Sequence, residues 1–336
     1  MTDAPIAVVG AAGTIGRVVT GFLESWRKPV ARRDARLEGE EHVDAADADA
    51  VARALRGAAV CVNCADYRLN LEVMHGCLEA GVHYVDLGGL FHMTRRQLEL
   101  DAPFREAGLT AILGLGSAPG KSNLLARAAV DRLGADPVSM HVWAASRDPA
   151  AADHPLPAPY SVRTLLDELR LPPVVLRGGE LVEVQPLSDA GEHDFPPPIG
   201  RARAIYTLHS ELATLPAAFP TLREASFRLS LPERLVDGLL ALPDGEEPKP
   251  YTQSPQAVAA HVVEVAAADG RSVVATALTS GGSARSTAEP AARAALELRQ
   301  GLLSAPGALA PEAAIPDPEA FLATLDTEIR FAAAAL

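Results

Sequence analysis

The first segment whose residues could do chemistry is a glycine-rich turn near the N-terminus. Gly10, Gly13 and Gly16 have the spacing G-x-x-G-x-x-G and follow the apolar run Ile6–Val9. Glycines permit a tight turn and a close approach to a pyrophosphate, and the start of the next helix offers free N–H donors. The alternative is a tight turn that binds nothing. We predict a dinucleotide site formed by Gly10, Gly13, Thr14, Ile15 and Gly16.

Charged residues at the end of the second apolar segment bear on the choice of cofactor. Arg32, Arg33 and Asp34 occupy this position. An acid here binds the ribose 2′-hydroxyl of NAD, whereas arginine pairs with the 2′-phosphate of NADP. Because two arginines face one aspartate, we predict NADP as the preferred cofactor and NAD as the alternative. If neither binds, these are solvated loop charges.

Further polar segments follow later predicted strands. Ligands of parallel sheets lie at the carboxyl ends of the strands. We therefore predict that the cofactor also contacts Asn63, Cys64, Ala65, Asp86 and Gly88. The run 114–123 combines glycines, hydroxyls, an amide and a lysine, and a substrate carboxylate suits it. The predicted substrate-binding residues in this run are Ser117, Pro119, Gly120, Lys121 and Asn123. For Lys121, a solvated lysine at a helix start is an equal alternative.

The elements that carry these residues alternate between strand and helix. Short apolar runs at 6–9, 60–63, 82–87 and 109–113 are typical of strands buried on both faces. Helical patterns separate them, and this alternation predicts a doubly wound parallel sheet of the Rossmann type, an α/β fold. The last of these predicted helices covers 97–107.

The pattern changes near residue 137. A strand at 138–145, a helix at 161–169 and two hairpins, at 174–184 and 258–279, predict an antiparallel α+β unit. The proline-rich stretch 187–198 is predicted to be a loop. Two helices are predicted to close the chain, and they cover 289–303 and 318–329.

Composition limits the class of protein. The chain has 336 residues, 48% hydrophobic and 22% charged, so it can bury a core. Its net charge of -13 disfavours nucleic-acid binding, and no apolar run is long enough to span a bilayer. Three cysteines without a signal peptide predict a cytoplasmic location. Cys61 and Cys64 form a C-x-x-C without a second ligand pair, so we predict no metal site.

Several motifs in a fixed order are more specific than the glycine turn. They include Gly-Val-His-Tyr-Val-Asp-Leu-Gly-Gly at 81–89 and Ser-Ala-Pro-Gly at 117–120. The full set of runs is 63–70, 76–89, 114–123, 159–161, 164–168 and 206–211. Together they resemble the saccharopine dehydrogenase-like reductase family, and this resemblance extends over nearly the whole chain.

This resemblance implies a domain organisation and a reaction. It implies a Rossmann domain at 1–123, an inserted α+β domain for substrate and dimer contacts at 124–280, and C-terminal helices at 281–336 that return to the Rossmann domain. It also implies a homodimer and NAD(P)-dependent chemistry at the C–N bond of an amino-acid-like small molecule, through imine reduction or the reverse oxidation. Ser286–Pro290 departs from the Thr-Gly that this family often has there.

Catalytic candidates lie in the predicted second domain. Imine reduction adds hydride to carbon and a proton to nitrogen, and a histidine beside a carboxylate suits the proton step. We predict His209 and Glu211 as catalytic; the alternative is a histidine satisfied in the core. Tyr160 and Ser161 are predicted to bind substrate, with a helix cap as an equal alternative for Ser161.

Two other functions remain open. Enzymes similar to homospermidine synthase share the implied architecture and recycle bound NAD in a redox-neutral transfer. A non-catalytic nucleotide-binding scaffold is the third possibility, and the altered Ser286–Pro290 segment is the reason to retain it.

Overall fold

The computed structural model describes residues 4–243, 245–246, 248 and 251–335, and the chain forms two compact units. Unit 1 comprises residues 1–121 and 287–316, and unit 2 comprises residues 122–286 and 317–336. Of the stretch 281–336, which is expected to return to the Rossmann domain, residues 287–316 belong to unit 1, whereas 281–286 and 317–336 belong to unit 2.

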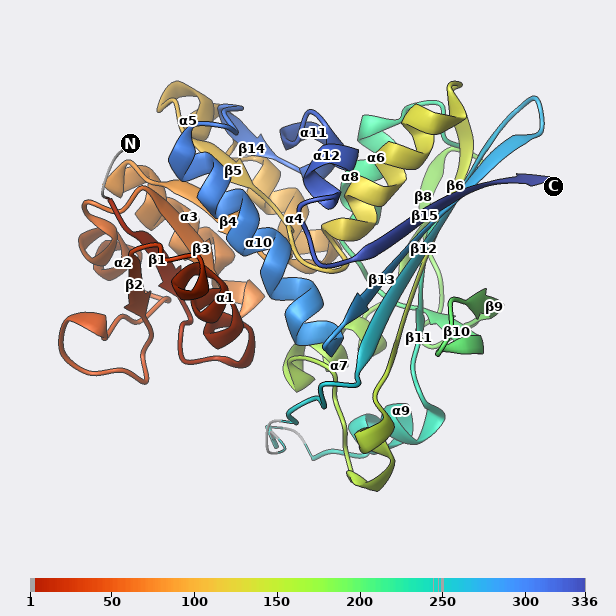
Figure 1. The fold of residues 1–336 in the computed structure, drawn as a ribbon, viewed down its shortest axis with the longest axis horizontal. Helices are drawn as coiled ribbons and strands as arrows, with labels where there is room; N and C mark the ends of the chain where they lie inside the picture. Colours follow the sequence, from red (N-terminus) through yellow and green to blue (C-terminus); the bar gives the residue numbers. More distant parts are fainter. Residues whose placement is uncertain (1–3, 244, 247, 249–250, 336) are drawn as a thin grey trace. The chain divides into compact units, whose positions relative to one another are not determined.

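Unit 1 contains a six-stranded sheet in the order β14-β5-β4-β3-β1-β2, in which every neighbouring pair is parallel (Figure 1). The strands are β1 (Ile6–Val9), β2 (Val30–Arg33), β3 (Val60–Asn63), β4 (His83–Asp86), β5 (Thr110–Ile112) and β14 (Gly307–Leu309). The helices are α1 (Thr14–Ser25), α2 (Ala48–Leu55), α3 (Asn70–Ala80), α4 (Leu90–Leu98), α5 (Asp101–Glu106), α11 (Pro311–Ala314) and most of α10 (Gly282–Gln300). The predicted Rossmann-type parallel sheet is confirmed.

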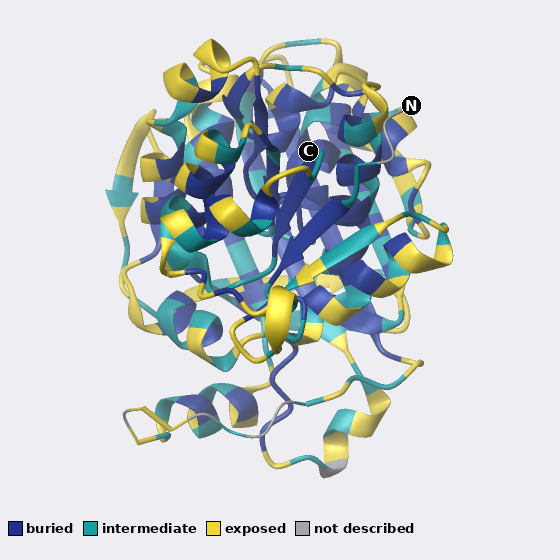
Figure 2. Ribbon diagram, turned by 90° about the vertical axis from the view of Figure 1, so that its left-hand side faces the viewer, coloured by how far each residue is buried: buried dark blue, intermediate teal, exposed yellow. Residues whose placement is uncertain are grey.

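The burial of the central strands accounts for the apolar runs that predict them. All residues of β1 and β3 are buried, as expected for central strands covered by helices on both faces. In α1, Val19 and Leu23 lie on the buried stripe, four residues apart. Figure 2 shows buried residues concentrated on the strands, while the helices also carry exposed residues.

Unit 2 contains a nine-stranded mixed sheet whose main path is β15-β13-β12-β6-β11-β10-β9, with β7 and β8 attached through β11. Its strands are β6 (Pro137–Arg147), β7 (Val174–Arg177), β8 (Glu180–Glu183), β9 (Asp189–Phe195), β10 (Gly200–Tyr206), β11 (Glu224–Ser230), β12 (Val258–Ala267), β13 (Arg271–Ser280) and β15 (Glu328–Ala335). Its helices are α7 (Val162–Arg170), α8 (Glu211–Ala218), α9 (Glu233–Leu240), α12 (Pro318–Leu322) and nearly all of α6 (Lys121–Leu133). Both predicted hairpins are present, and the α+β prediction is confirmed.

Three element predictions are wrong in detail. Residues 187–198 include the strand β9, whose charged side chains suit an exposed edge and conceal the strand pattern. The last predicted helix ends at Leu322, and β15 then pairs antiparallel with β13. The helix predicted at 97–107 is two helices, α4 and α5, of which α4 begins at Leu90.

Candidate functional site

The glycine turn of unit 1 joins β1 to α1, and its packing requires two of its glycines. Gly10 has φ +79°, and a Cβ there would lie 2.6 Å from the backbone carbon of Cys64. A Cβ on Gly16 would lie 2.1 Å from the carbonyl oxygen of Gly10. The turn and the first turn of α1 are therefore in closer contact than any side chain permits.

The start of α1 suits an anionic ligand. Gly13 is the N-cap, no side chain caps the helix, and its first turn contains no acidic residue. The N–H groups of Thr14, Ile15 and Gly16 have no acceptor one turn earlier in the helix, since these are its first residues. Together with the positive end of the helix dipole, they form a site that fits a pyrophosphate.

Arg32 and Arg33, at the end of β2, and Asp34, directly after it, each have a partner within the protein. Arg32 is exposed and pairs with Glu41 at 3.0 Å, while the Nε atom of Arg33 donates to the carbonyl of Ala54. Asp34 is buried; one of its carboxylate oxygens accepts from the backbone N–H of Ala12 in the glycine turn.

Arg36 is the cation that lies beside the glycine turn. Its guanidinium donates to both carboxylate oxygens of Asp34, at 2.9 and 3.0 Å. An added Cβ on Gly13 would lie 3.5 Å from its Nη2 atom. Burial raises the pKa of Asp34, but the hydrogen bonds from Arg36 and Ala12 outweigh this and hold the pKa below its usual value. The sequence analysis missed Arg36 because its position depends on how the loop after β2 turns back.

Asp86 ends β4 and is the centre of a buried polar network. It is 1% exposed, and its carboxylate accepts from Tyr84, Gln97 and the backbone N–H groups of Gly88 and Gly114. Burial raises its pKa, and these hydrogen bonds offset only part of the increase. Asp86 thus positions the segments that begin at Gly88 and Gly114, and its oxygens are already engaged within unit 1.

Asn63 belongs to the same network. Its Nδ2 atom donates to Asn70 and Tyr84, and its Oδ1 atom accepts from the backbone N–H of Ala65. Asn63 is therefore fixed at the end of β3, where it orients the backbone of Ala65. Cys64 lies between them, and burial raises the pKa of its thiol above the ordinary value.

The segment 114–121 is held by backbone contacts. The Gly116 N–H donates to the carbonyl of Pro119, and the Lys121 N–H donates to that of Gly116. Ser117 is part-exposed, whereas Pro119 and Gly120 are buried. Lys121 is 0% exposed, so the alternative of a solvated lysine at a helix start is wrong.

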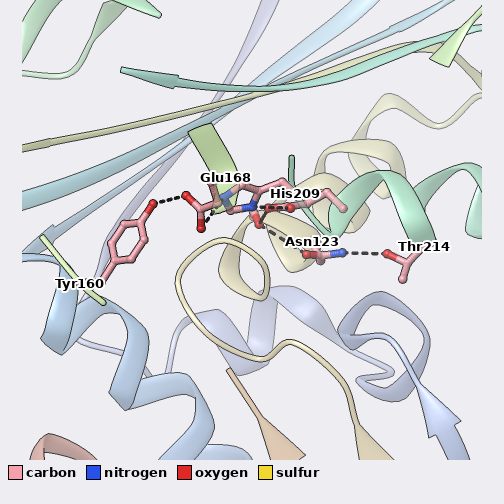
Figure 3. Close-up of polar contacts among 7 residues, drawn as sticks. Asn123, Tyr160, Glu168, His209 and Thr214 are labelled. Atoms are coloured by element: carbon pink, nitrogen blue, oxygen red, sulfur yellow. Dashed lines mark hydrogen bonds and ion pairs between the residues drawn. The ribbon is translucent and has the colours of Figure 1, made fainter. Parts of the chain in front are cut away.

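Unit 2 contains a second candidate site, a buried cluster around His209 (Figure 3). The Nδ1 atom of His209 lies 3.0 Å from Oε2 of Glu211, and its Nε2 atom lies 3.7 Å from Oε1 of Glu168. The imidazole stacks on the ring of Phe227, with centroids 3.6 Å apart. The predicted pairing of His209 with a neighbouring carboxylate is therefore present, and a second carboxylate joins it.

The other members of this cluster come from α6, from α8 and from the segment just before α7. Ser122 donates to Oε1 of Glu211 at 2.7 Å. Asn123, a predicted substrate ligand, is buried and donates to Thr214 at 3.2 Å. The Tyr160 phenol donates to Oε2 of Glu168. The cluster is thus a continuous set of polar contacts formed by these seven residues: Ser122, Asn123, Tyr160, Glu168, His209, Glu211 and Thr214.

The carboxylates control the protonation of His209. Burial lowers its pKa, but Glu211 and Glu168 more than offset this and raise the pKa to about 10. His209 is therefore an imidazolium at neutral pH, and it does not titrate there as a free histidine does.

Ser161 and Glu168 complete the comparison of predicted and observed site residues. Ser161 is the N-cap of α7 and accepts from the Thr164 N–H, as the helix-cap alternative states. Glu168, like Arg36, is a site residue that was not predicted from the sequence. Its signal was available, because a carboxylate beside Leu165 and Leu169 falls on the buried face of α7.

Comparisons with known proteins identify the first unit. Residues 6–112 match a family model described as the saccharopine dehydrogenase NADP binding domain. Across both units, the fold is similar to that of apo saccharopine dehydrogenase (L-Glu forming) from Saccharomyces cerevisiae. This match has a TM-score of 0.67 and 15% sequence identity, and it covers 99% of this chain and 100% of that chain.

Residues 6–112 thus resemble a saccharopine dehydrogenase NADP-binding domain, and the fold of the chain is similar to that of a saccharopine dehydrogenase. The fold is also similar to that of a homospermidine synthase from Legionella pneumophila in complex with NAD. That match has a TM-score of 0.69 and 9% identity, and it covers 99% of this chain and 92% of that chain. At such identities these two likenesses show a shared fold, whereas the matched domain indicates a nicotinamide cofactor.

Two features are absent from the described residues. No group of three or more histidine, cysteine or acidic side chains with the arrangement of a metal site occurs among them. None of the helices they form is both long and apolar enough to cross a membrane.

Proposed function

We propose that this protein is an NADP-dependent oxidoreductase that acts on the C–N bond of an amino acid or amino-acid conjugate. The observation that carries the proposal is the buried His209 side chain between the carboxylates of Glu168 and Glu211, in a chain whose residues 6–112 match an NADP-binding domain. Reduction of an imine and oxidation of an amine both require a proton to move at nitrogen while a hydride moves at carbon.

The residues of unit 1 fit the cofactor. The glycine turn and the N–H groups of Thr14, Ile15 and Gly16 would bind the pyrophosphate. Arg36, beside Gly13, would pair with a 2′-phosphate, and Asp34 holds this guanidinium in place. The nicotinamide, when bound, supplies the hydride acceptor or donor. NADP preference therefore rests in our proposal on Arg36, rather than on Arg32 and Arg33.

The cluster in unit 2 would handle the proton. The pKa of His209, raised to about 10, is close to that of an ordinary alkylamine, for which lysine at about 10.4 is the reference. A proton can therefore pass between such groups at little free-energy cost. In this proposal the carboxylate of Glu211 orients the imidazole ring of His209. The His209–Glu211 pair then holds the positive charge of His209 next to the carboxylate of Glu168.

A redox-neutral transferase is the second candidate, because the fold is also that of a homospermidine synthase solved with NAD. The two candidates differ in cofactor balance. An oxidoreductase consumes or produces NADPH in proportion to product, whereas a transferase that recycles its cofactor leaves the nicotinamide concentration unchanged.

The test begins with fluorescence titrations of NADPH and NADH. A turnover screen follows, in which L-lysine, L-alanine and spermidine are each paired with pyruvate and 2-oxoglutarate. We expect NADPH consumption with at least one pair. His209→Ala should then lose most of this turnover but bind NADPH as wild type does; full turnover in this variant contradicts a role for His209.

A further inference from the structure

One residue of the cluster in unit 2 is less buried than the others. Glu168, His209 and Glu211 are 3%, 5% and 0% exposed, whereas Tyr160 is part-exposed. Figure 3 shows Tyr160 at one end of the set of contacts and the Asn123–Thr214 pair at the other. Tyr160 is thus the least buried of the seven residues of the cluster, although its phenol group is buried beside Glu168.

The cluster contains two carboxylates and one imidazole. Glu168 and Glu211 share the single imidazolium of His209, and within the described part of the chain no other cation lies within 4.0 Å of either carboxylate. Buried charge is costly unless an opposite charge or a proton compensates it. A cationic ligand next to Tyr160 would compensate the excess negative charge, whereas an anionic ligand would add to it.

Two buried hydroxyls indicate that the neighbourhood of His209 has unused hydrogen-bonding capacity. The hydroxyls of Thr207 and Ser210 are buried and have no hydrogen-bond partner in the described structure. Buried polar groups are normally paired, with protein, water or ligand. Both lie within two residues of His209 in sequence, and their hydroxyls are unused as donors in the described structure.

The direction of the Tyr160 hydrogen bond determines what its oxygen can do. The phenol donates its proton to Glu168, so the lone pairs of Oη are available to accept a hydrogen bond from a ligand N–H. Burial, and after it the charge of Glu168, raises the pKa of Tyr160 well above its ordinary value. The phenol therefore passes a proton on to Glu168 rather than losing one to become a stable phenolate.

We propose that Tyr160 is the catalytic residue that exchanges a proton with the nitrogen of a cationic amine or iminium substrate, with Glu168 as the group that takes or returns this proton. The inference rests on the proposed oxidoreductase function and names the charge class of its substrate. In this relay the proton moves between the amine, Tyr160 and Glu168, which replaces a direct exchange between His209 and the amine. His209 and Glu211 are then positioning residues that act through Glu168.

The proton and electron balance is simple in the direction of oxidation. A substrate ammonium gives one N–H proton to Oη of Tyr160, and the phenol proton moves to Glu168. The neutral amine then loses a hydride from its carbon to the oxidised nicotinamide, and an iminium remains. In the direction of reduction, hydride adds to the iminium carbon, and the proton returns from Glu168 through Tyr160 to the amine nitrogen.

The test compares two tyrosines of unit 2 that each donate to a carboxylate. Tyr160→Phe removes the proposed relay hydroxyl. Tyr251→Phe is the matched control, because Tyr251 donates to Asp148 at 2.6 Å outside the cluster. With the best wild-type pair from the screen, Tyr160→Phe should lower kcat by roughly 100-fold or more, at the lower end of a general acid–base contribution. Tyr251→Phe should keep the wild-type kcat, and both variants should bind NADPH normally.

Two measurements separate a relay from a structural role. Glu168→Gln should lower kcat as Tyr160→Phe does, and the double variant should lose no more than either single variant, because the two groups act as one unit. In protein labelled at tyrosine Cζ, addition of the amine without cofactor should shift the Tyr160 resonance and leave that of Tyr251 unchanged.

The outcomes distinguish the relay from the function on which it rests. Turnover in wild type together with a near-normal kcat in Tyr160→Phe overturns the relay and leaves the oxidoreductase proposal intact. Additive losses in the double variant, or no Tyr160 shift with a turned-over amine, also overturn it. NADPH binding without any turnover in wild type contradicts the proposed function and the relay together.

Discussion

Replacement of Glu211 by glutamine is the perturbation that probes the buried cluster most severely. Glu211 is 0% exposed, lies 3.0 Å from His209 and accepts from Ser122 at 2.7 Å. Glu211→Gln keeps the shape of the side chain and removes its charge. The His209 imidazolium then retains only Glu168, at 3.7 Å, as an ionic partner.

The size of the effect follows from two independent arguments. Removal of one partner from a buried ion pair costs about 3–5 kcal/mol in free energy of unfolding. A histidine pKa raised from 6.5 to about 10 corresponds to on the order of 5 kcal/mol in favour of the charged form. Since about 1 kcal/mol moves the thermal midpoint of a domain of this size by about 2–4 °C, we expect a decrease of roughly 6–20 °C.

The pH dependence gives the sign. Because folding raises the pKa of His209, its stabilising contribution is complete below about pH 6.5 and is lost as pH rises towards about 10. Thermal unfolding of wild type, followed by circular dichroism, should therefore show a falling midpoint over this range. In Glu211→Gln the loss should occur at lower pH, and ¹⁵N NMR of labelled histidine should show His209 deprotonating earlier.

The matched control is Glu319→Gln, which breaks an exposed pair with Arg132 in the same unit. The side chains of this pair are 40% and 48% exposed, so solvent screens their interaction. Its thermal midpoint should stay close to that of wild type. Loss of a buried ion-pair partner of this size should lower the thermal midpoint by more than a degree or two. If Glu211→Gln also unfolds within a degree or two of wild type, the reasoning about the cluster is refuted.

Three further predictions concern unit 1. Gly16→Ala should abolish NADPH binding in a fluorescence titration, because its Cβ would lie 2.1 Å from the carbonyl oxygen of Gly10; normal affinity would show that the turn is not the pyrophosphate site. Arg36→Ala should weaken NADPH binding by roughly tenfold or more and leave NADH binding unchanged, since it removes a charge-assisted hydrogen bond; a larger effect from Arg32→Ala would instead support the simpler sequence prediction. Asp86→Asn should destabilise unit 1 by about 1–3 kcal/mol in chemical denaturation, because it leaves buried donors without full partners, and an unchanged midpoint would contradict its positioning role.

The parts of the fold that sequence predicted well are those with a strong local signal. The glycine turn, the apolar strands β1 and β3 and the hairpin β12–β13 each have a pattern that a short window reveals. The strands β9 and β15 lack such a pattern. β9 is an exposed, charged edge strand, and β15 becomes a strand because β13 offers it an edge, which is information from distant sequence.

The same distinction applies to the candidate site. His209 and Glu211 are neighbours in sequence, so their pairing could be predicted. The contact between Tyr160 and Glu168 is also local in sequence, since Tyr160 precedes α7 and Glu168 lies on the buried face of this helix. The contact of Glu168 with His209 joins segments about 40 residues apart. It depends on the approach of α7 to the segment before α8, where the Leu208 N–H donates to the Glu168 carbonyl.

The measurement that tests the central claim most directly is the stoichiometry of NADPH consumed to secondary amine formed in an amine-plus-oxo-acid reaction, with NADPH absorbance and product mass followed together. Our account predicts one NADPH oxidised for each imine C=N bond reduced to an amine C–N bond. It also predicts a large loss of rate in His209→Ala. Product formed without net NADPH consumption would support a cofactor-recycling transferase, and tight NADPH binding without any product would support a non-catalytic scaffold. Either result would contradict an oxidoreductase acting on a C–N bond.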